Sequence, residues 1–313
     1  DEVVLYDGSR IIGEVTSIRD EVLTIETQFA GTLVIGIDLV QSMRTDDTVA
    51  VLMEDNRLLE DVPLIVEEGQ FSMGTGNVYA LTDMAVTNPD PWELGDGYNW
   101  TGRISAAGEI QRGNTDTDEW DFALETRWSS LRDRFTVRAF GENDEAQGST
   151  TVKNWNATGK YDYFLTDPNY VGFQLFAEED EFADLDLRTL AGPYYGRQFY
   201  SEPIFTLSGE LGASYVDENF IVAEDDDYMA ANWQIEAQSN YLGGDSRIYF
   251  RQGGVWNLDE TSDVIVNTTV GLAFPLLWNF EAAAEVLYEY DSGAPDDVDD
   301  TDETYRFSFG YTW

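Results

Sequence analysis

The sequence contains no histidine and no cysteine, and only two of its 17 basic residues are lysines, Lys153 and Lys160. Without His or Cys, the chain cannot form a Ser-His-Asp or Cys-His nucleophile system, a zinc site of the usual kind, a thiolate redox centre or a disulfide bond. Metal binding through oxygen ligands and carboxylate chemistry remain open. We therefore expect no enzyme and no resident cofactor.

Positive charge is scarce throughout the chain. Its 313 residues include 61 Asp and Glu against 17 Lys and Arg, which gives a net charge of −44 and a pI of about 4.1. Such a polyanion repels nucleic acid, so we expect no nucleic-acid partner. High external salt would screen the repulsion among these charges, so the acidic composition indicates a halophilic or marine source. The alternative is a protein that is merely acidic. Aromatic residues at 14% argue against disorder of the whole chain.

Long hydrophobic runs are also missing, and no stretch of 18 apolar residues could form a transmembrane helix. The sequence starts at Asp1 without an apolar leader, which predicts either a cytoplasmic protein or a signal peptide already removed. Of 43 aromatic residues, only four precede Trp92. The composition changes at the proline-rich segment 88–91, so we predict a first domain at 1–88, a linker at 89–97 and a second domain at 98–313.

The first domain reads as short strands separated by turn residues, and its pattern recurs. The segment 5–12 aligns with 52–59, and Val15 and Ile18 fall on Val62 and Ile65. This predicts a tandem of two strand-rich units of about 45 residues, of the SH3-like or Sm-like type. A single self-similar meander is the alternative. Nothing here carries chemistry, which favours a small periplasmic binding or docking module.

The second domain contains twelve segments of about ten residues, and in each of them apolar and polar positions alternate. An even number of such strands is typical of an outer-membrane β-barrel, whereas a soluble β-sandwich would also alternate. Aromatic residues at the strand ends favour the membrane, because they suit the two interfaces. The final segment, 305–313, alternates aromatics up to Trp313, as expected for recognition by the barrel-insertion machinery.

The connections between these segments also favour the membrane, because long and short ones alternate. The long ones are 112–119, 142–152, 178–186, 216–227, 257–263 and 290–303, and the short ones are 129–133, 166–169, 201–203, 242–245 and 275–279. The long set holds 28 acidic residues and the short set four. Short periplasmic turns and long external loops predict this asymmetry. We therefore expect the first domain and the C-terminus to lie in the periplasm.

The segment 100–108, Trp-Thr-Gly-Arg-Ile-Ser-Ala-Ala-Gly, followed by Gly113-Asn114-Thr115-Asp116, resembles the opening of the YdiY-like family of salt-induced outer-membrane proteins. The later strands and the aromatic end extend the resemblance over about 98–313. It implies an outer-membrane barrel in contact with lipid and lipopolysaccharide. It implies no catalytic residue and no ligand.

The apolar face of each strand must meet lipid, so the opposite face lines the lumen. The predicted lumen residues are Arg103, Arg127, Arg134, Arg138, Lys160, Arg188, Arg247, Arg251, Arg306, Glu125, Asp162, Glu210, Glu236, Glu281, Glu285 and Glu289. Placing each base on the lipid face instead would cost roughly 2–4 kcal/mol at the midplane. Two interpretations remain open: arginine–carboxylate pairs that fill the interior, or opposed charged walls of a narrow pore.

Two hypotheses for the function follow. In the first, the barrel is a narrow, porin-like channel that leans towards cations because its mouth is acidic. In the second, the barrel anchors residues 1–88, which bind a periplasmic partner, peptidoglycan or a second copy of the chain. A separate prediction concerns Asp225, Asp226 and Asp227, whose carboxylates could gather Ca²⁺, although solvated surface charge also explains them.

Overall fold

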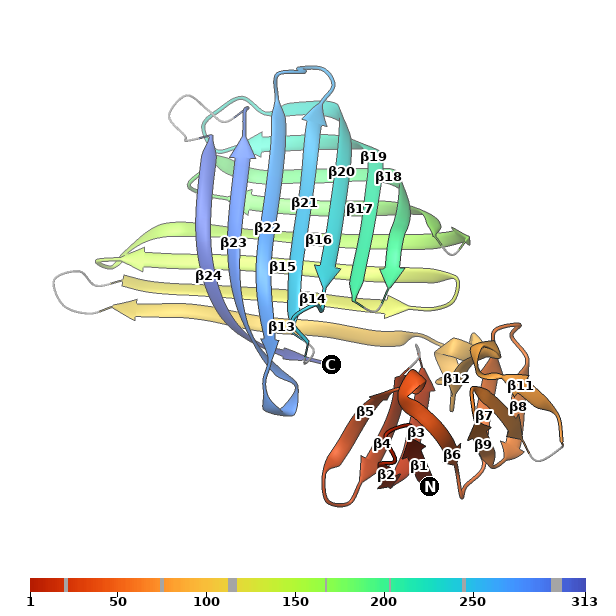
Figure 1. Cartoon of the computed structure of the whole chain (residues 1–313). Helices are drawn as coiled ribbons and strands as arrows, with labels where there is room; N and C mark the ends of the chain where they lie inside the picture. The colour runs from red at the N-terminus through yellow and green to blue at the C-terminus, as the bar shows by residue number, and fades with distance from the viewer. Residues whose placement is uncertain are drawn as a thin grey trace. The chain divides into compact units, whose positions relative to one another are not determined.

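The computed structural model describes residues 1–19, 22–73, 76–111, 117–166, 168–202, 204–243, 246–293 and 300–313. Contacts divide the chain into two compact units, Asp1–Asp96 and Gly97–Trp313. Figure 1 shows strands in both units. Within the described residues, no helix has the length and apolar character needed to cross a bilayer.

Within its described residues, the first unit contains twelve short strands and three 3-10 helices. They are β1 (Glu2–Leu5), β2 (Arg10–Ile12), β3 (Glu14–Arg19), β4 (Val22–Thr27), β5 (Gly31–Gly36), η1 (Ile37–Leu39), β6 (Val40–Arg44), β7 (Val49–Met53), β8 (Leu58–Val62), β9 (Leu64–Glu67), β10 (Gln70–Met73), β11 (Val78–Ala80), η2 (Leu81–Asp83), β12 (Met84–Thr87) and η3 (Pro91–Leu94). Strands β1–β6 therefore correspond in order to β7–β12, in line with the repeat seen in the sequence.

The two repeats do not form two separate small barrels. They build two six-stranded sheets, ordered β11-β10-β9-β6-β1-β2 and β5-β4-β3-β12-β7-β8, and each sheet takes strands from both repeats. Adding six to every strand number converts one sheet into the other. The exchange arises because β6 pairs with both β1 and β9, and β12 pairs with both β7 and β3.

One hydrophobic core holds both repeats together, and it includes Val3 and Leu23 from the first and Val66 and Phe71 from the second. Two buried threonines occupy corresponding places at the ends of β6 and β12. The Thr45 hydroxyl oxygen accepts a hydrogen bond from the Leu64 amide at 2.8 Å, and the Thr87 hydroxyl oxygen accepts one from the Ile18 amide at 2.6 Å. Each satisfies a backbone donor of a strand in the other repeat, Leu64 at the start of β9 and Ile18 near the end of β3.

The second unit is one closed antiparallel barrel of twelve strands. They are β13 (Asn99–Gln111), β14 (Thr117–Ser129), β15 (Asp133–Ala146), β16 (Ser149–Thr166), β17 (Asn169–Asp180), β18 (Leu185–Glu202), β19 (Phe205–Phe220), β20 (Asp226–Ser239), β21 (Arg247–Asn257), β22 (Val264–Pro275), β23 (Phe280–Asp291) and β24 (Thr301–Thr312), with η4 (Leu277–Asn279) before β23. In Figure 1, β22–β24 cross in front of β14–β16, as the strand tilt of a closed sheet requires. The all-β prediction with a twelve-stranded barrel is confirmed.

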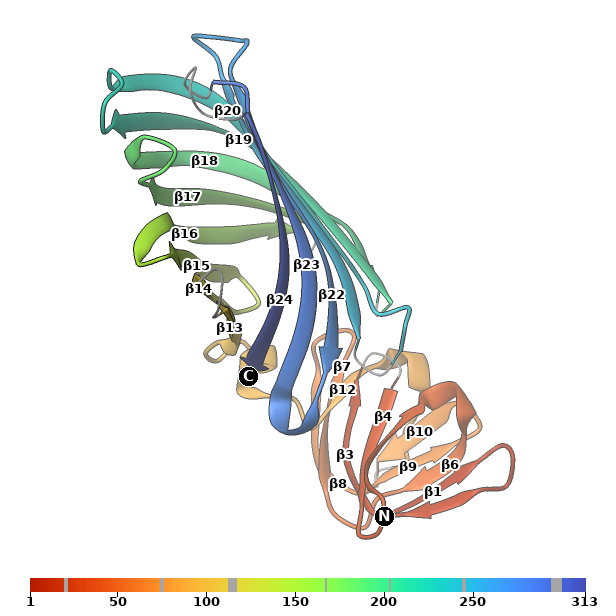
Figure 2. The ribbon, with the colours of Figure 1, turned by 90° about the vertical axis from the view of Figure 1, so that its left-hand side faces the viewer.

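The barrel closes where β24 meets β13. Arg103 to Ala106 pair with Phe309 to Thr312, and the backbones of Gly102 and Trp313 exchange two hydrogen bonds of 3.0 Å. Figure 2 shows the C-terminus lying beside β13. A side chain at position 102 would overlap the Trp313 indole, since an added Cβ would lie 2.3 Å from it. Glycine at this position therefore lets the last aromatic residue cover the seam.

The strands extend further into the predicted long connections than the sequence pattern indicated. β15 and β16 run through most of 142–152 and leave only Gln147 and Gly148 as the turn, both with positive φ. β17 to β20 similarly take up parts of 178–186 and 216–227. Backbone pairing continues beyond the apolar stretch because an antiparallel ladder also forms in water. Parts of the first and last predicted connections lie outside the described residues.

Candidate functional site

The sixteen predicted lumen residues all occupy the inward face of the barrel. Fifteen of them line one of three cavities along its interior, and Glu281 forms ion pairs with two that do, Arg103 and Arg247. The register passes through Gly192–Pro193 and Gly253–Gly254 without a shift, so the alternation keeps its phase there.

The three cavities follow one another along the barrel. The turn-end chamber, about 540 Å³, reaches Ser201 and Thr312 at the end with the short turns. The middle chamber measures about 380 Å³ and the loop-end chamber about 110 Å³. Neighbouring chambers share lining residues, which are Arg103, Glu125, Arg138, Arg251 and Glu285 in one case and Glu178, Arg188, Ile265, Asn267 and Glu289 in the other. Charged side chains therefore divide the lumen at two levels.

At the first level, four side chains form what we call the cross-lumen bridge: Glu125 on β14, Arg138 on β15, Glu236 on β20 and Arg251 on β21. Arg138 lies 2.7 Å from Glu236 and 3.2 Å from Glu125, and Arg251 lies 3.1 Å and 2.9 Å from the same two carboxylates. In a closed order of twelve strands, β14 and β20 stand six strands apart, on opposite walls. The bridge therefore spans the interior.

At the second level, Arg188 of β18 forms ion pairs with three carboxylates. Its nitrogens lie 3.1 Å from Glu178, 2.5 Å from Glu218 and 3.4 Å from Asp291. The first two are on the adjacent strands β17 and β19, but Asp291 belongs to β23, five strands away. This cluster therefore also reaches across the barrel.

Apart from Arg127, the remaining lumen bases form ion pairs closer to one wall. The pairs are Arg103 and Arg247 with Glu281, Arg134 with Asp162, Lys160 with Glu210, and Arg306 with Asp121 and Glu285. Arginine predominates because its planar fork can hold two carboxylates or a carboxylate and a ring at once. Arg306 does so, since its guanidinium also lies 4.2 Å from the centre of the Phe140 ring.

Inward tyrosines lie over glycines of the neighbouring strand. Tyr170 is directly opposite Gly196, and Tyr194 is opposite Gly172. A Cβ added to Gly196 would come within 2.1 Å of the Tyr170 ring, so only glycine leaves room for the ring against the wall. From this position the Tyr170 hydroxyl donates to Glu210 at 2.9 Å, and the Tyr194 hydroxyl donates to Asp162.

The same arrangement recurs on the other side of the barrel. Tyr249 faces Gly271, where an added Cβ would lie 2.1 Å from its ring, and its hydroxyl donates to Glu285 at 2.6 Å. In this way the tyrosines hold three of the lumen carboxylates in place while occupying little of the interior. These tyrosines were not among the predicted site residues. Their inward phase could have been read from the alternation, but their pairing with glycine required the register.

Charge is distributed unevenly along the lumen. Among the described residues, the loop-end chamber is lined by eight carboxylates and one base, Arg188. The turn-end chamber is lined by seven bases and five carboxylates. A cation entering from the loop end therefore meets an attractive vestibule, whereas the chamber beyond the cross-lumen bridge carries excess positive charge.

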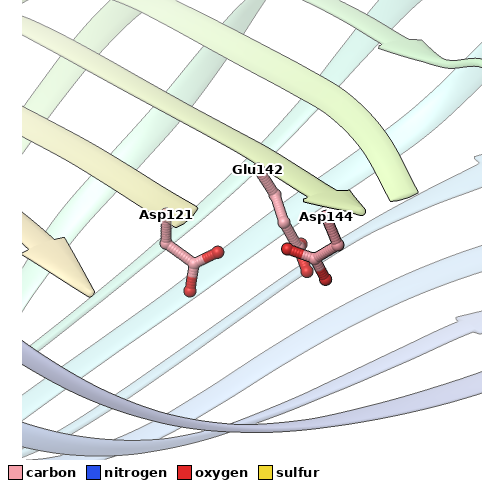
Figure 3. A group of neighbouring side chains, drawn as sticks. All are labelled: Asp121, Glu142 and Asp144. Carbon is pink, nitrogen blue, oxygen red and sulfur yellow. The ribbon is translucent and has the colours of Figure 1, made fainter. Parts of the chain in front are cut away.

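One group of carboxylates has the spacing that a metal ion needs. Oxygens of Asp121, Glu142 and Asp144 all lie within 4.8 Å of one another, and Figure 3 shows Glu142 and Asp144 side by side with Asp121 facing them. Asp121 is directly opposite Glu142 in the register, so β14 and β15 set the spacing. A hard divalent cation suits such oxygens, but Arg306 already lies 2.8 Å from Asp121 and offsets one charge.

The predicted calcium residues are arranged differently. Asp225 precedes β20, and Asp226 and Asp227 are its first two residues, whose side chains alternate between faces. Asp225 accepts a hydrogen bond from the Phe220 amide, and Asp227 accepts one from the Tyr215 hydroxyl. Within the described part of the chain, these three do not form a group with metal-ligand spacing.

The barrel exposes large apolar side chains such as Phe173, Leu211 and Phe307 on its outer face. Together with a closed antiparallel sheet and a charged lumen, this gives it the features of an outer-membrane β-barrel protein. The chain belongs to the family described as "Protein of unknown function, DUF481", whose profile matches residues 104–313. It is 23% identical over 240 residues to the uncharacterized protein YdiY of Escherichia coli strain K12, a match that covers 72% of this chain and 91% of YdiY. The resemblance to a YdiY-like family is thereby confirmed.

Solved structures of other barrel proteins are similar to this chain at low sequence identity. The NanC porin is 11% identical, with a TM-score of 0.44, and the match covers 68% of this chain and 99% of NanC. The β domain of the Bordetella autotransporter BrkA is 13% identical with a TM-score of 0.35, covering 69% and 98%. Outer membrane phospholipase A from Escherichia coli is 12% identical with a TM-score of 0.36, covering 69% and 96%.

Proposed function

We propose that the barrel is a narrow channel that leans towards cations, with its acidic loops facing the exterior and the first unit and the C-terminus in the periplasm. The observation that carries this proposal is the loop-end chamber, where eight carboxylates surround a single arginine. A ring of carboxylates at a pore entrance raises the local cation concentration and disfavours anions. The role is non-enzymatic, in keeping with a sequence that has no His or Cys.

The high net charge suggests the setting in which such a channel would work. High salt screens the repulsion among the external carboxylates, so the barrel fits a saline environment and expression induced by salt. The cross-lumen bridge would then set the narrowest part of the path, because its arginines hold side chains from opposite walls together.

Conductance in planar bilayers under a KCl gradient tests the channel. We expect discrete single-channel currents. The sign of the reversal potential should show that K⁺ passes more readily than Cl⁻. Asp180→Asn, Glu289→Gln and Asp302→Asn in combination remove three charges that line the loop-end chamber and should move the reversal potential towards zero. The control combines Glu179→Gln, Asp217→Asn and Glu303→Gln, which remove three charges from outward-facing strand positions near the same end.

A channel is ruled out if the folded wild-type barrel gives no current above background. Equal shifts in the two triple variants would contradict a role for the lumen carboxylates in particular, because general surface charge would then suffice.

The cross-lumen bridge also favours a second candidate function, that of a structural anchor. Ion pairs between opposite walls would fill the interior and brace the barrel without leaving a path for solutes. In that case the barrel is an anchor, and residues 1–88 bind a periplasmic partner or another copy of the chain. Cross-linking in intact cells, with and without residues 1–88, tests this directly. Loss of a cross-linked species on deletion, combined with absent conductance, would support the anchor over the channel.

A further inference from the structure

Three arginines lie together on one wall of the turn-end chamber. Arg127 of β14 is directly opposite Thr136 of β15 and therefore diagonal to Arg134 and Arg138 on the same face. All three side chains line the chamber. Such a cluster is unfavourable unless each charge is compensated.

Two of the three arginines have close carboxylate partners. Arg134 lies 2.6 Å from Asp162, and Arg138 lies 2.7 Å from Glu236. Arg127 differs from both, because its only ion pair within the described residues is with Glu125, at 3.6 Å. The Nε atoms of both Arg127 and Arg138 are shielded from solvent and donate no hydrogen bond to the described part of the protein, but Arg138 has its close Nη2 contact with Glu236 and Arg127 has no contact of that length.

Glu125 cannot compensate Arg127 fully, since it is shared. Its carboxylate already lies 3.2 Å from Arg138 and 2.9 Å from Arg251. The bridge and Arg127 together bring three guanidinium groups to two carboxylates, Glu125 and Glu236. One positive charge is therefore left over. The chamber as a whole agrees, since its seven lining bases face five lining carboxylates and Glu281, which forms ion pairs with Arg103 and Arg247.

We propose that Arg127 anchors a binding site for a small organic carboxylate in the turn-end chamber. A volume of about 540 Å³ lies in the range of small-molecule sites. The planar guanidinium fork matches a carboxylate and can bind both of its oxygens. Hydroxyl groups of Thr136, Thr206 and Ser208 also line the chamber and suit the polar remainder of such a ligand.

A singly charged carboxylate fits this site better than a phosphate dianion. Only one positive charge is left over, and a second negative charge would be repelled by Glu125 and Glu236. The site is reached from the turn end of the barrel and does not require an open path past the cross-lumen bridge. It therefore goes beyond the proposed channel, and it can be tested in a barrel that conducts no current.

Calorimetric titration of the refolded, full-length protein in detergent micelles at low ionic strength tests the site. Sodium gluconate serves as the probe, with glucose as a neutral reference of similar size. We expect saturable binding of gluconate at one site per barrel and none of glucose. Arg127→Gln should weaken gluconate binding about tenfold or more, and Arg127→Lys should weaken it less, because lysine keeps the charge without the fork.

Arg197→Gln is the matched control. Arg197 lies on β18 near the same end of the barrel and does not line the chamber. Its replacement by glutamine removes the same charge as Arg127→Gln. Heat-modifiable electrophoretic mobility establishes that each variant is folded. The site is overturned if wild-type protein shows no saturable gluconate binding, or if Arg197→Gln weakens binding as much as Arg127→Gln. Tighter binding of inorganic phosphate than of gluconate would overturn the assignment to carboxylates.

Discussion

Arg138 of β15 and Glu236 of β20 meet across the lumen, with the guanidinium Nη2 2.7 Å from the carboxylate oxygen. The two strands are separated by four others in the closed order, so the contact joins walls that share no backbone hydrogen bond. Ladder pairing alone fixes neighbouring strands but not the cross-section of a barrel. The bridge therefore limits both the width of the lumen and the distortion of the sheet.

Arg138→Ala should lower the free energy of unfolding by about 1.5–3 kcal/mol, the range for hydrogen bonds to charged groups. Glu236 would keep Arg251 as a partner at 3.1 Å, which places the expected loss near the lower end. If the barrel is a channel, the same variant should also increase its single-channel conductance, because a side chain is removed from the narrowest level. Urea unfolding in detergent and bilayer recordings measure the two effects.

The exchanged pair Arg138→Glu with Glu236→Arg keeps the composition and restores the contact across the lumen. We expect it to recover part of the stability that either single replacement loses. A double variant whose loss equals the sum of the two single losses would show that the residues do not interact, and the bridge would then have no structural role.

The tyrosines over glycines give a second prediction. Gly196→Ala should destabilise the barrel by about 1–3 kcal/mol, because overpacking forces the Tyr170 ring off the wall and away from Glu210. Gly159→Ala is the control, since a Cβ there meets nothing within 4 Å. Thermal melting in detergent compares the two. Similar melting temperatures for both variants would contradict the steric argument.

The inward charges of the barrel could be read from the sequence, whereas their partners could not. Alternation alone places Arg138 and Glu236 on the inner face, because the cost of a charge facing lipid fixes the phase of each strand. Which carboxylate meets which arginine depends on register and on the curvature of the closed sheet. For the same reason the composition could not reveal Tyr170 over Gly196, or that the closest ion pair of Arg127 is longer than that of any other described lumen arginine.

The first unit shows a different limit of structure prediction from the sequence. Its strands and its repeat are visible in the sequence, because turn residues and apolar alternation are local signals. The exchange of strands between repeats is not, since β6 could have closed on β3 of its own repeat as readily as on β9 of the other. The choice depends on long-range contacts, such as Met43 opposite Val66, that have no counterpart in either repeat alone.

The paired threonine hydrogen bonds give a third prediction. Thr87→Val keeps the side-chain volume but leaves the Ile18 amide without its acceptor, and should cost about 1–3 kcal/mol of stability. Thr32→Val, at an exposed position of β5, is the control and should be nearly neutral. Chemical unfolding of residues 1–96 measures both. Equal stabilities would mean that another group satisfies the Ile18 amide.

The strand exchange predicts how fragments of the first unit behave. Residues 1–47 contain β1–β6, but β6 and β3 would each lose the neighbour that the other repeat supplies. Because adding six to each strand number maps one sheet onto the other, a second copy of 1–47 can offer the missing strands. We therefore expect residues 1–96 to fold as a monomer, and residues 1–47 to fold only as a homodimer that unfolds on dilution. Light scattering coupled to size exclusion, with circular dichroism at several concentrations, distinguishes these states. A folded monomer of residues 1–47 would show that one repeat is self-sufficient, and the exchange would then be a consequence of tethering two complete domains.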